Sequence, residues 1–167
     1  NTFAEVDYFI DCLLSIIKPQ RDKELVVENA PNNTVNTLTS TDVLNIFSKA
    51  HSCDAWHREI LLLGKQLQRL DNNDRNNNNL IHGCESLAWL KVRQDPSGFF
   101  KFQADSDAKI IRGLLVIVLA VFNGQKAEKI QSFDIADYFE KLGLIKHLSP
   151  SRSNGLLAIV EKIQKSV

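Results

Sequence analysis

Two short runs of alternating apolar and polar residues lie near the middle of this 167-residue chain, at 87–92 and 100–104. An alternation with a period of two residues is typical of β-strands. Between the runs, Pro96 and Gly98 stand where a type I turn favours them. We therefore predict a β-hairpin over about 87–104, whose Trp and Phe side chains need a covering helix.

The segment before the hairpin has the periodicity of helices. We predict a short helix that Ser40 or Thr41 caps and that runs to about Lys49. Asp54 is expected to cap a second helix, whose apolar residues recur at three- and four-residue steps. The stretch at 71–79 is rich in Asn and carries no apolar residue, so we expect an exposed loop there. The buried face of the second helix is predicted to consist of Trp56, Ile60, Leu63, Leu67 and Leu70.

The segment after the hairpin is helical by pattern as well. A helix at about 107–122, capped by the polar residues at 105–107, is apolar over much of its circumference, as expected of a central, buried helix. A shorter helix is predicted over about 134–143, and a last one begins with Ser149 as its cap and a proline in its first turn. The order of helices, hairpin and helices predicts an α+β fold, with a small antiparallel sheet packed against several helices.

The first 40 residues differ from the rest of the chain. Apolar residues between Phe3 and Ile17 line one face of a predicted helix, and a loop or linker follows at 29–34. An appended helix is the simpler interpretation, and a helix dedicated to binding a partner is the alternative. The predicted organisation is an N-terminal extension at 1–40 followed by a domain at 41–167.

The composition argues against several classes of protein. Lys and Arg together number 20, as do Asp and Glu, so the formal net charge at pH 7 is zero. Binding along a nucleic-acid backbone needs a basic face, so we expect no nucleic-acid partner. The longest apolar stretch, 114–122, is far shorter than the ~20 residues of a membrane-spanning helix. Three cysteines without a close pair argue against a disulfide framework and favour a reducing compartment, so we expect a cytoplasmic protein.

Cys84 has the setting of a thiol that is offered to a partner. Gly83 precedes it, polar residues flank it and the hairpin follows, so we expect it on a turn just ahead of the sheet. A thiolate attacks a sulfur atom directly, provided that it is accessible and sufficiently ionised. Arg152 in the last helix, or backbone N–H groups around Gly83, would favour the thiolate if they lie close to it. A buried cysteine with only a packing role is the alternative.

Other chemistries match the sequence less well. A phosphatase-like loop needs an arginine closer to the cysteine than Arg93, and a cysteine hydrolase needs a base that orients the thiol. The spacing pairs neither His82 nor His147 with Cys84. A zinc site is a further alternative, but the spacing of its ligands matches no strong signature, so we expect no metal. The nitrogen and sulfur ligands of such a site would be His51, Cys53, His57, His82 and Cys84.

Four short blocks between about 40 and 167 together resemble one known family. In their order and spacing they are similar to the SufE family of sulfur acceptors, which includes the closely related CsdE proteins. The resemblance implies a SufE/IscU-like fold. The blocks are LGKQL at 63–67, HGCES at 82–86 with Trp89, DSDA at 105–108 leading into GLL at 113–115, and LGL at 142–144 with HLSPSRSNGL at 147–156.

The resemblance implies a function in sulfur transfer. In the family, a cysteine desulfurase that contains pyridoxal phosphate (SufS- or CsdA-like) strips sulfur from cysteine and holds it as a persulfide. The loop cysteine that matches Cys84 attacks the terminal sulfur, becomes the persulfide and passes sulfur to an iron–sulfur scaffold or another acceptor. The cofactor belongs to the partner, so none is expected here. The chain would thus be an activator of an enzyme rather than an enzyme itself.

The neighbours of Cys84 in the motifs are expected to support the loop. His82, Gly83 and Glu85 lie in the same block, and Glu85 occupies a position where family members vary. Asp107 and Arg152 match family positions near the cysteine loop, so we assign them to loop conformation and partner docking. The rival function is a non-catalytic adaptor that binds a desulfurase or another partner while Cys84 is only structural.

Overall fold

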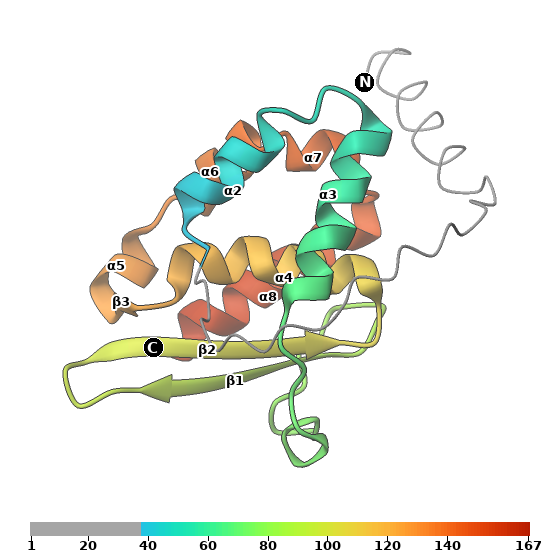
Figure 1. Ribbon diagram of the computed structural model, residues 1–167. Coiled ribbons are helices and arrows are strands. Elements are labelled where there is room, and N and C mark those ends of the chain that lie inside the picture. Colours follow the sequence, from blue (N-terminus) through green and yellow to red (C-terminus); the bar gives the residue numbers. More distant parts are fainter. Residues whose placement is uncertain (1–37) are drawn as a thin grey trace, which may run out of the picture.

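The computed structural model describes residues 38–167. The predicted helix between Phe3 and Ile17 and the loop after it lie outside these residues. Figure 1 shows the described part as an antiparallel sheet along one side of the molecule, with helices stacked above it. This arrangement confirms the predicted α+β class.

The predicted hairpin forms the main part of the sheet. Strands β1 (Ala88–Gln94) and β2 (Phe99–Ser106) pair antiparallel, in a register that places Leu90 opposite Ala104. The turn between them closes with a hydrogen bond of 3.0 Å from the Gly98 N–H to the Asp95 carbonyl. Alternate residues of both strands point into the core and are buried: Ala88, Leu90, Phe100, Phe102 and Ala104.

A third strand, which the sequence analysis did not predict, completes the sheet. Strand β3 (Gln125–Lys126) pairs antiparallel with the start of β2, so the strand order is β1-β2-β3. Gly124 precedes it in the left-handed region at φ 70° and donates its N–H to the Phe100 carbonyl at 2.9 Å. Helix α5 (Ala127–Ser132) follows, and it was not predicted either. A strand of two residues is too short for its periodicity to be detected.

Helix α4 (Lys109–Phe122) is the central element, as its apolar sequence predicts. It packs against β2 on one side and against α2 (Ser40–Phe47), α3 (Cys53–Gln66) and α8 (Pro150–Lys165) elsewhere. Figure 1 shows α4 over the sheet, with α2 on the side away from the strands. Its buried residues include Leu114, Ile117, Val118 and Phe122, all of them fully enclosed.

Several predicted helix starts require small corrections. The N-cap of α2 is Thr39, one residue before the predicted choices, and Thr39 forms a capping box with Asp42. The N-cap of α3 is Ser52, whose hydroxyl accepts the Ala55 N–H at 3.1 Å, whereas Asp54 lies in the first turn. Helix α4 begins after Ala108 and is not capped by the residues at 105–107. Asp105 and Ser106 are the last residues of β2, and Asp107 follows that strand. Ser, Thr and Asp compete for the N-cap position, so local sequence places a cap only to within a residue or two.

The predicted buried face of α3 is confirmed over the helix itself. Trp56, Ile60 and Leu63 are buried, and they lie on one side of the helix. Leu67 and Leu70 lie beyond the last helical residue, Gln66, although Leu70 is buried as well.

The C-terminal helices agree with their predicted caps. Helix α6 (Ile135–Lys141) begins after Asp134, and α8 begins after Ser149 with Pro150 in its first turn. A four-residue helix, α7 (Leu144–His147), was not predicted and follows Gly143 at φ 68°. The buried face of α8 consists of Leu156, Ile159, Val160 and Ile163, which are all enclosed. Within residues 38–167, no helix is both long and apolar enough to span a membrane.

The Asn-rich loop before the cysteine is more ordered than expected. It contains a short 3-10 helix, η1 (Asn72–Asp74), and three of its residues, Asp74, Arg75 and Asn79, are partly buried. Asp74 pairs with Lys91 on β1 at 2.6 Å, and Arg75 pairs with the buried Asp105 at 2.6 Å. Most of the loop is exposed, as expected, but these two charged side chains find partners on the sheet.

Candidate functional site

Cys84 lies on a short loop that is closed at its base. The Ile81 N–H donates to the Ala88 carbonyl at 2.8 Å, and Leu80 forms an isolated β-bridge with Trp89. Ile81 and Ala88 are both buried, at 3% and 0% exposure. The core thus anchors both ends of the loop, and the residues at 82–87 project from this base.

Hydrogen bonds from the end of β2 fix the C-terminal end of the cysteine loop. The Ser106 hydroxyl donates to the Leu87 carbonyl at 2.7 Å, and the Asp107 N–H donates to the same oxygen at 3.2 Å. Ser106 is fully buried, whereas the side chain of Asp107 is exposed. Asp107 therefore contacts the loop through its backbone, and its carboxylate is left toward solvent.

Helix α8 forms a seat for the cysteine itself. The Cys84 thiol donates to the Gly155 carbonyl with an Sγ–O distance of 3.3 Å. A Cβ atom on Gly155 would lie 3.3 Å from Sγ, and one on Gly83 would lie 3.2 Å from the Ala158 Cβ. Lys162 Nζ donates to the Leu80 carbonyl at 3.1 Å. Gly155, Ala158 and Lys162 are three and four residues apart and therefore lie on one face of α8. The cysteine loop packs against this face.

The small residues of this seat are needed for the close approach. Gly83 has φ 96°, a backbone conformation that residues with a side chain rarely adopt. Gly155 is buried in the interior of α8, where a glycine costs helix stability relative to alanine. Sequence analysis missed Gly155 and Ala158 as site residues, although a glycine within a helix is a signal of close approach.

The thiol is sheltered rather than activated in this conformation. Cys84 is partly buried and has a free thiol, and burial raises the pKa of that thiol. A raised pKa means a smaller thiolate fraction at neutral pH. The loop must therefore move, or the thiol must gain a new environment, before Cys84 becomes a strong nucleophile.

Arg152 lies three residues before Gly155, in the first turn of α8, and is partly buried. Its charge acts on His57 of α3, whose pKa is lowered first by burial and then by Arg152. Among residues 38–167, no ion pair joins Arg152 to Asp107. The charge of Arg152 is thus felt on α3, at His57.

The remaining predicted site residues surround the thiol on the loop. His82, Gly83 and Glu85 are all exposed, so they present the outer surface of the loop to solvent. The structure thus brings four predicted residues into one loop and adds Gly155, Ala158 and Lys162 from α8. In the described part of the chain, no group of three or more His, Cys, Asp or Glu side chains is placed to hold a metal ion.

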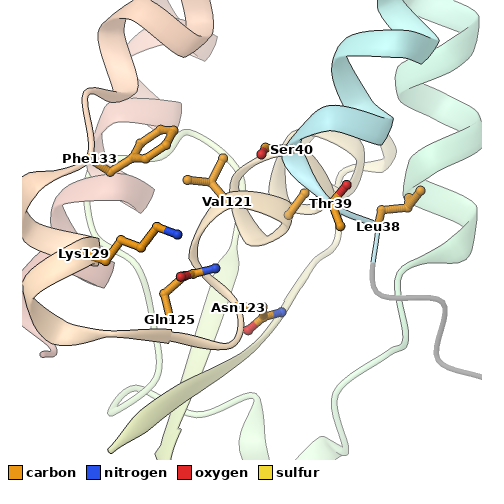
Figure 2. A pocket seen from close by; sticks show the side chains of 9 residues that line it. Leu38, Thr39, Ser40, Val121, Asn123, Gln125, Lys129 and Phe133 are labelled. Carbon is orange, nitrogen blue, oxygen red and sulfur yellow. The ribbon is translucent and has the colours of Figure 1, made fainter.

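The cavities of the protein lie away from this loop. Figure 2 shows one of about 210 Å³, where the start of α2 meets the end of α4 and Phe133. Two others, of about 580 and 430 Å³, lie beside β2 and beside β3. Cys84 lines none of these three cavities. The thiol therefore lies on a surface loop outside these three cavities, partly buried against α8.

Comparison with a solved structure extends this description of the fold. The chain is similar to a hypothetical protein from Thermus thermophilus whose solution structure is known. The two share 13% sequence identity and superpose with a TM-score of 0.60, over 75% of this chain and 90% of the other. This likeness concerns the fold alone.

Comparison with protein families gives a more specific result. The family model named SufE, the Fe–S metabolism associated domain, matches residues 41–167. The match includes the hairpin, the cysteine loop and the whole of α8. On this evidence from sequence and fold, the chain belongs to the SufE family and has a role in Fe–S metabolism.

Proposed function

We propose that this protein is a sulfur-transfer accessory protein whose acceptor group is Cys84. It takes persulfide sulfur from a pyridoxal-phosphate-dependent cysteine desulfurase, and in doing so regenerates and stimulates that enzyme. It then passes the sulfur to an iron–sulfur scaffold or another acceptor in the cytoplasm. The observation that carries this proposal is the free Cys84 thiol on a projecting, anchored loop in a chain of the SufE family.

The transfer step needs no cofactor on this chain. The Cys84 thiolate attacks the terminal sulfur of the donor persulfide, and a bond forms between Cys84 Sγ and that sulfur. The sulfur–sulfur bond within the donor breaks, and the donor cysteine leaves as a thiolate. The proton of the Cys84 thiol passes to solvent or to that leaving thiolate, and no external oxidant or reductant is consumed.

The surroundings of Cys84 support a partner of macromolecular size. Cys84 lines none of the three cavities described above, whereas the apolar side chain of Leu87, on the same loop, is exposed at 52%. Exposed apolar side chains beside a reactive group favour a protein–protein contact. Docking of the desulfurase on this surface would draw the loop away from α8 and lower the burial that raises the pKa of Cys84.

The test is an intact-mass measurement after incubation with a cysteine desulfurase and cysteine. We expect the protein to gain the mass of sulfur, with the added atom mapped to Cys84 by peptide analysis. The Cys84→Ser variant serves as the matched control and should gain none. A protein that gains no sulfur with any of several desulfurases would overturn the proposal.

Measuring desulfurase turnover separates this proposal from the adaptor alternative. In the sulfur-transfer function, Cys84→Ser still binds the desulfurase but no longer stimulates it. An adaptor that uses the same surface would stimulate the enzyme equally well with serine at this position. Binding measured alongside turnover ensures that a loss of stimulation reflects chemistry and not a loss of docking.

A further inference from the structure

The hydrogen bond between Cys84 and Gly155 depends on the chemical state of the sulfur. Sγ donates its proton to the Gly155 carbonyl at 3.3 Å. A carbonyl oxygen only accepts, so a sulfur without a proton cannot make this bond. Once Sγ is bonded to a second sulfur, it carries no proton, and the contact loses its donor.

The close approach of the loop to α8 also limits where a second sulfur atom can lie. A Cβ on Gly155 would lie only 3.3 Å from Sγ and 3.8 Å from the Cα and Cβ of Cys84, so helix and loop are already close. A sulfur–sulfur bond is about 2.05 Å long. A terminal sulfur that took the place of the thiol proton, along the hydrogen-bond direction, would end about 1.3 Å from the Gly155 oxygen, so the Cys84 side chain must turn or withdraw from this carbonyl when it is loaded.

The negative charge of a persulfide also disfavours its contact with the Gly155 carbonyl. A persulfide is more acidic than a thiol, because the neighbouring sulfur stabilises its anion, so it is ionised at neutral pH. An anion that faces a carbonyl oxygen in a partly buried site has lost hydration and gained no donor, which is unfavourable. Lys162, on the same face of α8, donates its ammonium group to the Leu80 carbonyl and not to the sulfur.

We propose that the α8 seat formed by Gly155 and Ala158 distinguishes the two states of Cys84, holding the thiol and excluding the persulfide. The empty acceptor rests with its loop on α8. The loaded loop does not return to that seat, so its terminal sulfur stays exposed to the next acceptor. This inference rests on the proposed function of Cys84. It adds a reason why sulfur passes from Cys84 to the next acceptor.

The first experiment compares the loop in its two states without any desulfurase. Inorganic polysulfide converts the Cys84 thiolate to a persulfide, because the thiolate takes one sulfur and the shortened polysulfide leaves. Intact mass confirms the loading. Amide hydrogen exchange of the peptide at 80–87 is then expected to be about threefold to tenfold faster in the persulfide form, the effect of losing one hydrogen bond or more. Equal exchange in the two forms would overturn the inference.

Two substitutions of the cysteine isolate the hydrogen bond. Serine in Cys84→Ser keeps a donor for the Gly155 carbonyl, whereas alanine in Cys84→Ala does not. Loop exchange is expected to be faster in the alanine variant than in the serine variant. The same exchange in both would show that the bond does not hold the loop.

A substitution on α8 tests the steric part. In Gly155→Ala the added methyl group displaces the loop, so exchange should be fast already in the thiol form and change little on loading. Asn154→Ala, at an exposed position of the same helix, is the control and should respond to polysulfide as the wild type does. A Gly155→Ala loop that stays as protected as in the wild type would contradict the proposed seat.

These outcomes are independent of the sulfur-transfer test. If a desulfurase loads Cys84 but loading leaves loop exchange unchanged, the seat inference fails and the proposed function stands. If polysulfide loading releases the loop but no desulfurase loads Cys84, the proposed function fails while the property of the seat remains.

Discussion

A single side chain, Cys84, combines two properties that oppose each other. In the proposed role of sulfur acceptor it must ionise, yet burial raises the pKa of its thiol and its proton is engaged by a backbone carbonyl. Both features favour the protonated form over the reactive form. The thiol is therefore protected in this conformation, and the proposed function requires the loop to change its position before Cys84 reacts.

The raised pKa predicts how alkylation of Cys84 depends on pH. Because the thiolate is the nucleophile, the rate with iodoacetamide should rise through the pKa of the thiol. We expect the midpoint at higher pH in the folded protein than in the same chain unfolded in urea. The extent of reaction is measured at Cys84 by peptide mass spectrometry. A midpoint that is equal or lower in the folded protein would show that the thiol is not sheltered in solution.

At the scale of elements, two helix contacts depend on glycine. Helices α3 and α4 cross so closely that a Cβ on Gly113 would lie 2.1 Å from the Ile60 carbonyl oxygen. A Cβ on Gly64 of α3 would lie 2.8 Å from the Lys109 oxygen. This crossing positions α4 over the sheet, and through it the end of β2 that holds the cysteine loop.

Substitution of Gly113 is therefore expected to be strongly destabilising. The methyl group of Gly113→Ala cannot fit without separating α3 from α4, and we expect a loss of about 3 kcal/mol or more in the free energy of unfolding. Gly98→Ala is the matched control, since Gly98 has φ 84° but open space around it, and should cost about 1 kcal/mol. Urea denaturation of both variants measures the difference. Equal losses would mean that the helix crossing adapts.

At the scale of the whole molecule, Asp105 joins segments that are distant in sequence. Its carboxylate is completely buried and lies 2.6 Å from Arg75, 3.3 Å from Arg69 and 3.7 Å from Arg112. It also accepts the Leu70 N–H at 3.2 Å. The segment after α3, the end of β2 and the start of α4 thus meet at one buried charge, directly beside the exit of the cysteine loop.

Removing this charge should destabilise the entire fold. Asp105→Asn leaves the surrounding arginines without their anion, and loss of one partner from a buried ionic group costs about 3–5 kcal/mol. Asp137→Asn breaks an exposed pair with Lys141 and should change stability little. Thermal unfolding followed by circular dichroism compares the two variants. Similar melting temperatures for both would argue that the buried network contributes no net stability.

Local sequence predicted most of the fold for an identifiable reason. The period-two runs specify the hairpin, and the three- and four-residue apolar steps specify the buried faces of α3 and α8. Turn and cap residues such as Gly98, Asp134 and Ser149 act on the backbone within a few residues of themselves, so their turn or helix start can be predicted from local sequence. Elements of two to six residues, β3, α5 and α7, were missed because they are too short to show a period.

What sequence alone determined was the hairpin, the longer helices around it, the family to which the chain belongs and the place of Cys84 just ahead of the sheet. Tertiary structure alone decided what the thiol touches. Cys84 and Gly155 are 71 residues apart, and Asp105 meets Leu70 across 35. Such contacts arise from the packing of complete helices against the sheet, and no local pattern encodes them. The shelter of the thiol is therefore a property of the folded molecule, whereas its place in the chain is a property of the sequence.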